Sequence, residues 1–232
     1  MKLREPEAIA RAADALAAGE IVVFPFNGIF VIVGDADDPA VPEKIAIAKQ
    51  RPQAKGVALV CPPEALAEHV APDAVLGWPL SRVQDLYKSV HAVGVILPAA
   101  SPGAPAHVVQ AATILNVWTE QQPRSPLREL VLEHRRRGHR ALAGTSANQS
   151  GQPTITDPAL VTSVFVGRVP LIVIDTFTAL PPVRRHSASI VDLTGPAPRL
   201  VREGSVPASE LRAALRRLGI CELAVPTDVP RI

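Results

Sequence analysis

Hydrophobic residues occur along the chain in two patterns: short, wholly apolar runs, and longer segments in which they recur every three or four positions. The short runs are typical of strands buried on both faces of a sheet, and the longer segments of amphipathic helices. The runs predict strands at residues 21–24, 29–33, 57–61, 93–97, 113–117, 141–143, 171–174, 189–193 and 199–201. The periodic segments predict helices at residues 6–19, 42–49, 63–69, 80–87, 126–137, 158–164 and 207–218.

Strands and helices therefore alternate along the chain, which indicates an α/β layer architecture. No stretch between them has the length or composition of a linker between domains. We expect one domain over residues 1–222 and a short tail over residues 223–232, where prolines and turn formers follow the last helix.

Composition narrows the class of protein. The 232 residues are 47% hydrophobic but only 3% aromatic, so the core must be built from Ala, Val, Leu and Ile. The net charge of +2 is too small for a dedicated nucleic-acid coat, and the basic run at residues 135–140 is explained better by the polar face of a helix than by a phosphate site. Cys61 and Cys221 lie far apart without metal-type spacing, which argues against a disulfide framework or a zinc site.

The N-terminal segment and the hydropathy pattern bear on location. Residues 1–16 are charged and helical in pattern, without the basic stretch and apolar block of a signal peptide. No apolar run approaches the roughly 20 residues that a membrane helix needs. We therefore expect a cytoplasmic protein with no membrane association.

Three cations follow the helix predicted at residues 42–49. Because proline disfavours a helical residue before it, the helix should stop at Arg51, next to Pro52, and hold Lys49, Arg51 and Lys55 on a tight loop before the next strand. Arginine binds phosphate oxygens as a fork and lysine as a point charge, so these cations suit a polyphosphate. The alternative is a solvated helix end whose cations complement the helix dipole.

Residues 142–153, LAGTSANQSGQP, gather several hydrogen-bonding groups where the strand at residues 141–143 should end. Thr145, Ser146, Asn148 and Ser150 offer hydroxyls and an amide, and the flanking glycines let backbone approach a ligand closely. The alternative is an ordinary strand-to-loop turn, since Ser, Asn and Gly are the usual turn residues. Together with the basic loop, this segment favours a ligand site.

Five segments, in this order, resemble the YrdC-like threonylcarbamoyl-AMP synthase family, which includes YciO-like proteins. They are GEIVVFP (19–25), KQRPxxKG (49–56), TSANxSG (145–151), SASIVDLTG (187–195) and RLVREG (199–204). The matches cover roughly residues 5 to 210. The resemblance implies a single YrdC-like domain: a twisted, mixed sheet with flanking helices around a concave basic cleft.

The resemblance also implies an activity, as one step of a tRNA modification pathway. In this family, threonine captures carbon dioxide from bicarbonate, and the resulting carbamate attacks the α-phosphate of ATP and releases pyrophosphate. ATP and an accompanying Mg²⁺ are implied, but no particular catalytic side chain. The residues implied in ATP or phosphate binding are Lys49, Arg51, Lys55, Asn116, Thr145, Ser146, Asn148, Ser189 and Arg202.

The substrate pocket departs from the family pattern. The resemblance places this pocket at Pro25, Phe26, Asn27, Gly28 and Ala188. Phe26 stands where the family usually has threonine, Asn27 where it has an acidic residue, and Ala188 where it has serine. Phenylalanine removes a hydroxyl and adds bulk, so we expect threonine to bind weakly or not at all.

A phosphate contact is changed as well, because Asn116 aligns with a family arginine. Losing an arginine removes a charge-assisted hydrogen bond of about 1.5–3 kcal/mol. Three functions stay open: a working threonylcarbamoyl-AMP synthase with shifted residues, an enzyme forming a different carbamoyl- or acyl-adenylate, or a non-catalytic protein that binds nucleotide, double-stranded RNA or tRNA. RNA binding, which is ascribed to the family, would rest on shape and phosphate contacts.

Overall fold

The computed structural model of the protein describes residues 1–2, 5, 7–51, 56–71, 79–119, 125–149, 152–175, 185–220 and 222–230. Its helices are α1 (Ala8–Ala17), α2 (Val41–Ala48), α3 (Leu80–Ser89), α4 (Pro126–Arg136), α5 (Pro158–Phe165), α6 (Ala208–Arg217) and the 3-10 helices η1 (Pro63–Glu68) and η3 (Ala106–Val108). Its strands are β1 (Val22–Phe26), β2 (Ile29–Asp35), β3 (Ala58–Val60), β4 (Val93–Pro98), β5 (Val109–Gln110), β6 (Thr113–Trp118), β7 (Leu142–Ser146), β8 (Leu171–Ile172), β9 (Ser189–Asp192) and β10 (Arg199–Arg202). Within these ranges, no helix combines the length and the apolar character needed to cross a membrane.

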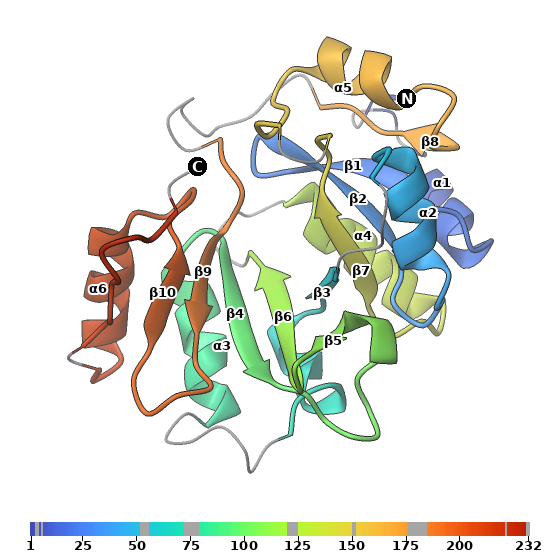
Figure 1. The fold of residues 1–232 in the computed structure, drawn as a ribbon. Helices are drawn as coiled ribbons and strands as arrows, with labels where there is room; N and C mark the ends of the chain where they lie inside the picture. The colour runs from blue at the N-terminus through green and yellow to red at the C-terminus, as the bar shows by residue number, and fades with distance from the viewer. Residues whose placement is uncertain are drawn as a thin grey trace.

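All the described strands belong to one mixed sheet of ten strands (Figure 1). Their order is β10-β9-β4-β6-β3-β7-β2-β1-β8, and β5 pairs with β6 outside this path. The pairs β1–β8, β3–β6 and β4–β9 are parallel, whereas β1–β2, β2–β7, β4–β6 and β9–β10 are among the antiparallel ones. In Figure 1, α3 and α6 lie beside the β9–β10 half of the sheet, and α1, α2 and α4 beside the β1–β2 half. The predicted α/β fold, with a mixed sheet and flanking helices, is confirmed.

β1 and β2 form a hairpin that continues beyond the predicted apolar runs. Phe26 pairs with Ile29, which leaves a two-residue loop of Asn27 and Gly28. Both loop residues have positive φ angles, 47° and 76°, and Asn-Gly is favoured in such loops because their twist matches that of the two strands. Pro25 is tolerated inside β1 because β8 pairs only with the first two residues of that strand.

The core is densest around this hairpin. Every residue of β1 and β2 is buried, as wholly apolar runs predict. Four residues at helical spacing form the buried face of α1: Ala8, Ala12, Ala13 and Leu16. Small aliphatic side chains dominate the buried set, so the prediction of a core built from Ala, Val, Leu and Ile is confirmed.

The last residues of the chain run along β10. The Leu200 N–H donates to the Ala224 carbonyl at 2.8 Å, and the Ala224 N–H to the Pro198 carbonyl at 2.9 Å. Further on, the Glu203 N–H donates to the Pro230 carbonyl at 3.0 Å. The segment predicted as a tail therefore packs against the sheet.

Candidate functional site

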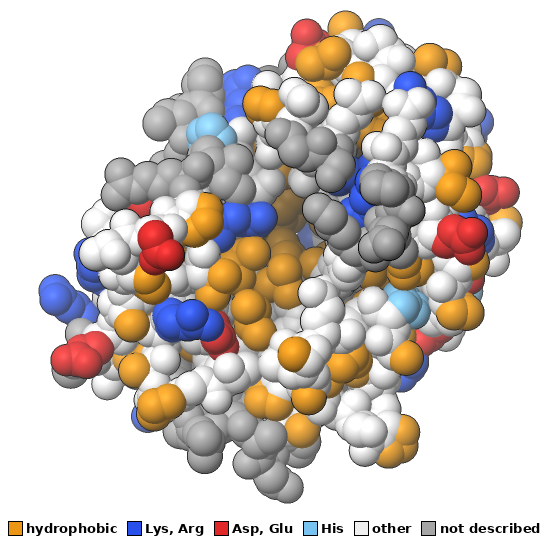
Figure 2. Space-filling model, in the orientation of Figure 1, with side chains coloured by type: hydrophobic (Ala, Val, Ile, Leu, Met, Phe, Trp, Pro, Cys, Tyr) orange, Lys and Arg blue, Asp and Glu red, His pale blue; other side chains and the backbone are white. Residues whose placement is uncertain are grey.

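A cavity of about 240 Å³ is lined by residues of both halves of the sheet. Figure 2 shows this face of the molecule hollowed near its centre, with hydrophobic side chains on the floor and Lys or Arg side chains at the edge. β2, β3, β6 and β7 supply the floor, and the end of β10 with the residues that precede β9 supplies part of the rim. Strands far apart in the sequence therefore meet at one ligand-sized space.

Strand alternation explains why the floor is apolar. Ile29, Val31 and Val33 occupy every second position of β2, so they point to the same face of the sheet. The apolar floor residues on the neighbouring strands are Ala58, Val60, Leu115 and Val117. Among the described lining residues, Arg202 is the only charged one. The charge in the described lining therefore lies at the rim.

Arg202 is held on the rim by the backbone before β9. Its Nε and Nη2 atoms both donate to the Ala188 carbonyl, at 3.2 and 2.7 Å, and its Nη1 has no hydrogen-bond partner among the described residues. Burial lowers the pKa of the guanidinium from its usual value. The backbone after β10 can lie close to the backbone before β9 because residue 204 is glycine. A Cβ there would lie 2.1 Å from the Ser187 carbonyl oxygen. One guanidinium donor is thus left for a ligand.

A second polar junction joins the end of α2 to the end of β7. Lys49 Nζ donates to the Ser146 carbonyl at 2.7 Å and to Asn148 Oδ1 at 3.4 Å. The Ser146 hydroxyl donates to the same Asn148 oxygen at 2.7 Å, and Ser146 also lines the cavity beside Thr145. The structure thus brings together three of the residues implied in phosphate binding, although they come from two segments about 100 positions apart.

Burial decides between the two interpretations of the cations after α2. Lys49 is 5% exposed and Arg51 is 9% exposed, so neither belongs to a solvated helix end. Burial also lowers the pKa of Arg51. Neither residue lines the cavity itself, but Lys49 reaches it through Ser146. Lys55 and Ser150, which were also implied in the site, lie outside the described residues.

Two residues implied in nucleotide binding require correction. Asn116 lies between Leu115 and Val117, so it points away from the cavity, and its fully buried amide exchanges hydrogen bonds with the Cys61 backbone. Ser189 is also fully buried, donates to the Val206 carbonyl at 2.5 Å and accepts from the backbone after β10. Both side chains are engaged in the fold and do not face the ligand space.

The predicted substrate pocket is partly assembled at the cavity. Phe26 and Ala188 line it, whereas Pro25, Asn27 and Gly28 do not. Asn27 lies in the hairpin loop, between the lining residues on either side, and is 6% exposed. Both polar atoms of its amide lack a hydrogen-bond partner in the described part of the chain. An unpartnered buried amide is a group that a bound ligand can satisfy.

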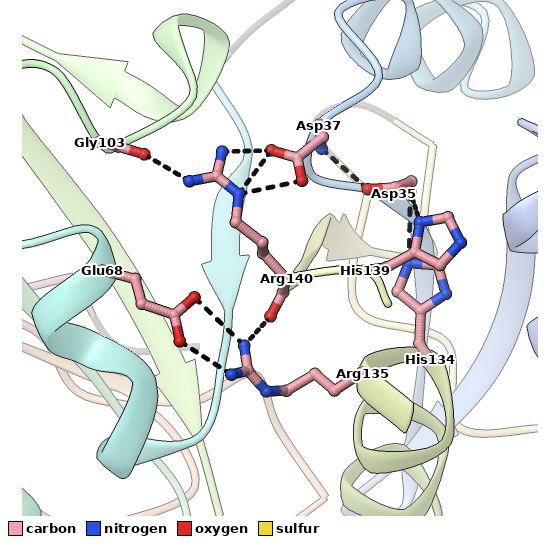
Figure 3. A network of polar contacts seen from close by, with 8 residues as sticks. All are labelled: Asp35, Asp37, Glu68, Gly103, His134, Arg135, His139 and Arg140. Atoms are coloured by element: carbon pink, nitrogen blue, oxygen red, sulfur yellow. Dashed lines mark hydrogen bonds and ion pairs between the residues drawn. The ribbon is translucent and has the colours of Figure 1, made fainter. Parts of the chain in front are cut away.

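A separate cluster, not anticipated from the sequence, lies where β2 meets the end of α4 (Figure 3). Asp35 Oδ2 is 2.5 Å from His139 Nδ1 and 3.4 Å from His134 Nε2, and the imidazole rings stack with centroids 4.1 Å apart. The neighbouring arginines are paired: Arg135 with Glu68 at 2.8 Å, and Arg140 with Asp37. These pairs support the interpretation of the basic run as a structural polar face.

Ring geometry argues against a metal ion in this cluster. Asp35, His134 and His139 each offer a ligand atom within 4.8 Å of the others, which is compatible with one ion by distance alone. An ion bound to imidazole lies close to the plane of the ring. The two planes here are stacked and only 12° from parallel, so one ion cannot lie in both. The cluster is better described as a carboxylate shared by two stacked imidazoles.

Asp35 should make stability depend on acid pH. Burial alone would raise its pKa, but the His134 imidazole, the Asp37 backbone N–H and the His139 imidazole lower it to about 2. A carboxyl with a pKa depressed from about 3.9 stabilises the fold above that pH and loses the contribution as pH falls toward 2. We expect Asp35 to contribute about 2–3 kcal/mol at neutral pH. Denaturant unfolding of the parent and Asp35→Asn between pH 5 and 2 measures it, and parallel curves would contradict the expectation.

Comparison with solved structures places the chain in a known class of mixed-sheet domain. Sua5 from P. abyssi complexed with L-threonine has a TM-score of 0.73 and 23% identity, covering 94% of this chain and 58% of that one. YciO from E. coli has a TM-score of 0.64 and 21% identity, covering 84% and 88%. The chain thus spans about three fifths of the Sua5 structure. At these identities the likeness establishes the fold.

The family follows from the sequence. The Sua5/YciO/YrdC family model, described as telomere recombination, matches residues 14–204. The chain belongs to this family. It is 26% identical over 168 residues to a threonylcarbamoyl-AMP synthase of Pseudoalteromonas translucida, covering 72% of this chain and 85% of the relative. A threonylcarbamoyl-AMP synthase of Photobacterium profundum is 38% identical over 50 residues, which is 22% of this chain and 27% of the relative.

Proposed function

We propose that the protein binds ATP at this cavity and transfers its adenylyl group to a carbamate, the reaction for which its threonylcarbamoyl-AMP synthase relatives are named. The observation that carries the proposal is the convergence of cations on one apolar cavity. Lys49 reaches its edge through Ser146, and Arg202 lies on its rim with one guanidinium nitrogen that has no partner among the described residues. Such an arrangement suits a ligand that combines phosphates with an apolar body.

The reaction asks little covalent chemistry of the protein. Bicarbonate loses hydroxide to give carbon dioxide, and the amine of an amino acid bonds to that carbon. The proton that the amine loses combines with the hydroxide to give water. A carbamate oxygen then attacks the α-phosphorus of ATP while the bond to pyrophosphate breaks. Positioning two anions together and neutralising the departing charge are the main requirements. In this proposal Lys49 and Arg202 supply the positive charge, and the segment from Thr145 to Asn148 orients the nucleotide.

Magnesium fits the substrate better than the protein. Mg²⁺ is usually held by one or two carboxylates together with water and substrate phosphates. No Asp or Glu is present among the described residues that line the cavity. We therefore expect Mg²⁺ to enter with the phosphates of ATP, and no protein ligand is assigned to it.

Thermal unfolding with ATP, pyrophosphate or a short double-stranded RNA tests the proposal. A ligand at 100 times its Kd stabilises the native state by about 2.7 kcal/mol, which for a chain of this size raises Tm by about 5–10 °C. We expect that shift with ATP, and pyrophosphate release once bicarbonate and an amino acid are added. A shift with RNA and none with ATP would overturn the proposal in favour of a non-catalytic RNA-binding protein.

A further inference from the structure

We infer that the amino acid accepted by this site has a branched apolar side chain, the size of valine or isoleucine, in place of threonine. The inference rests on the proposed adenylate-forming function and specifies its second substrate. The bonds made and broken are those described above, because only the amino-acid side chain differs: the amine gains the carbamate carbon, and pyrophosphate leaves the α-phosphorus.

The described side chains that line the cavity beside the hairpin are apolar, and the Asn27 amide in the hairpin loop is not among them. Phe26 and Ala188, the lining residues of the predicted substrate pocket, are both apolar. Ile29, Val31 and Val33, the floor residues of β2, continue this apolar surface. A threonine hydroxyl placed against these side chains would lose its hydrogen bonds to water without gaining others, whereas a methyl group in the same place would gain contacts.

The polar residues that line the cavity are Thr145 and Ser146 at the end of β7, and Ser187 and Arg202 on the rim. Ser146 is the strand partner of Val31, but its hydroxyl already donates to Asn148 Oδ1 at 2.7 Å. The Ser187 hydroxyl lies 3.1 Å from that of Thr154. Arg202 offers a cation that suits a carboxylate or a phosphate. This polarity fits an anionic head on the rim and an apolar body against the apolar surface.

Valine and threonine provide a sharp comparison because they have nearly the same shape and differ in one hydroxyl. We expect the parent protein to release pyrophosphate with a kcat/KM for valine about 10- to 100-fold higher than for threonine, at saturating ATP and bicarbonate. Phe26→Thr should shift this ratio at least about tenfold toward threonine. Ile47→Thr is the matched control, since Ile47 is 69% exposed on α2 and should not change the ratio.

Each outcome decides the inference separately from the proposed function. Calorimetric titration of valine and threonine in the presence of a non-hydrolysable ATP analogue supports it if valine binds more tightly. Equal or stronger binding of threonine overturns it, as does failure to bind either amino acid, while ATP-induced stabilisation would still uphold the proposed function. If threonine is preferred, and Ser146→Ala abolishes the preference, the Ser146 hydroxyl is the recognition group and the apolar surface is not decisive.

Discussion

Replacing Lys49 with methionine should remove most of the stabilisation that ATP or pyrophosphate confers. Lys49 is buried, and its ammonium group lies between the Ser146 carbonyl and Asn148, at the edge of the cavity. A hydrogen bond from a charged donor contributes about 1.5–3 kcal/mol, so ATP affinity should fall about 10- to 100-fold. The ATP-induced change in Tm, measured over a range of ATP concentrations, gives the affinity of each variant.

Lys44 provides a matched control on the same helix. Its ammonium group also makes two hydrogen bonds, to the Gly19 carbonyl at 2.6 Å and to Asp38 Oδ2 at 2.7 Å, but neither partner belongs to the cavity. Lys44→Met should therefore lower Tm in the absence of ligand and keep the parent response to ATP. If Lys49→Met and Lys44→Met respond to ATP alike, Lys49 is only a structural cation.

The second large effect is expected at Asn116, on stability and not on binding. Its Oδ1 accepts from the Cys61 N–H at 3.1 Å, and its Nδ2 donates to the Cys61 carbonyl at 3.3 Å and to the Tyr87 hydroxyl at 3.0 Å. Asn116→Ala leaves these buried groups unsatisfied, at a cost of about 1–3 kcal/mol each. We expect a total loss of about 3–5 kcal/mol and a decrease in Tm of about 10 °C.

Thr113→Ala, on the same strand, is the comparison for Asn116→Ala. The Thr113 hydroxyl donates to the Gln110 carbonyl at 2.8 Å in an exposed position, so its loss should cost less than about 1 kcal/mol. Once folded, both variants should bind ATP as the parent does. A specific loss of ATP affinity in Asn116→Ala, with Tm unchanged, would restore Asn116 to the nucleotide site.

Most elements of the fold could be predicted because most strands contain an apolar run and most helices have an apolar stripe; the short η3 and β5 were not among those predicted. The ends of β2, β7 and β10 could not, since polar residues continue these strands. β7 was expected to stop at residue 143 but extends through Thr145 to Ser146, which pairs with Val31 of β2. The hydroxyls of Thr145 and Ser146 therefore lie on a strand, and Asn148 follows in the loop. Hydropathy alone does not indicate where such a strand ends.

Residues of the candidate site could be predicted where a local sequence motif contains them. Lys49 and Ser146 come from such motifs, and the structure joins them. Asn116 was misassigned because a shift of one position on a strand moves a side chain to the opposite face, and alignment to a motif does not reveal the facing. The cluster of Asp35 with His134 and His139 was missed because Asp35 lies about 100 positions before the two histidines, and only the folding of the chain brings them together.

The final segment of the chain has a consequence for how the molecule behaves among its own copies. β10 is the first strand in the sheet order, so one of its edges would offer unpaired backbone groups to a strand of another molecule if nothing covered it. Ala224 and Pro230 occupy that side by accepting hydrogen bonds from Leu200 and Glu203. The strand that carries Arg202 is thereby shielded from edge-to-edge aggregation. The tendency of the protein to associate through this edge therefore depends on a few residues that follow the last helix.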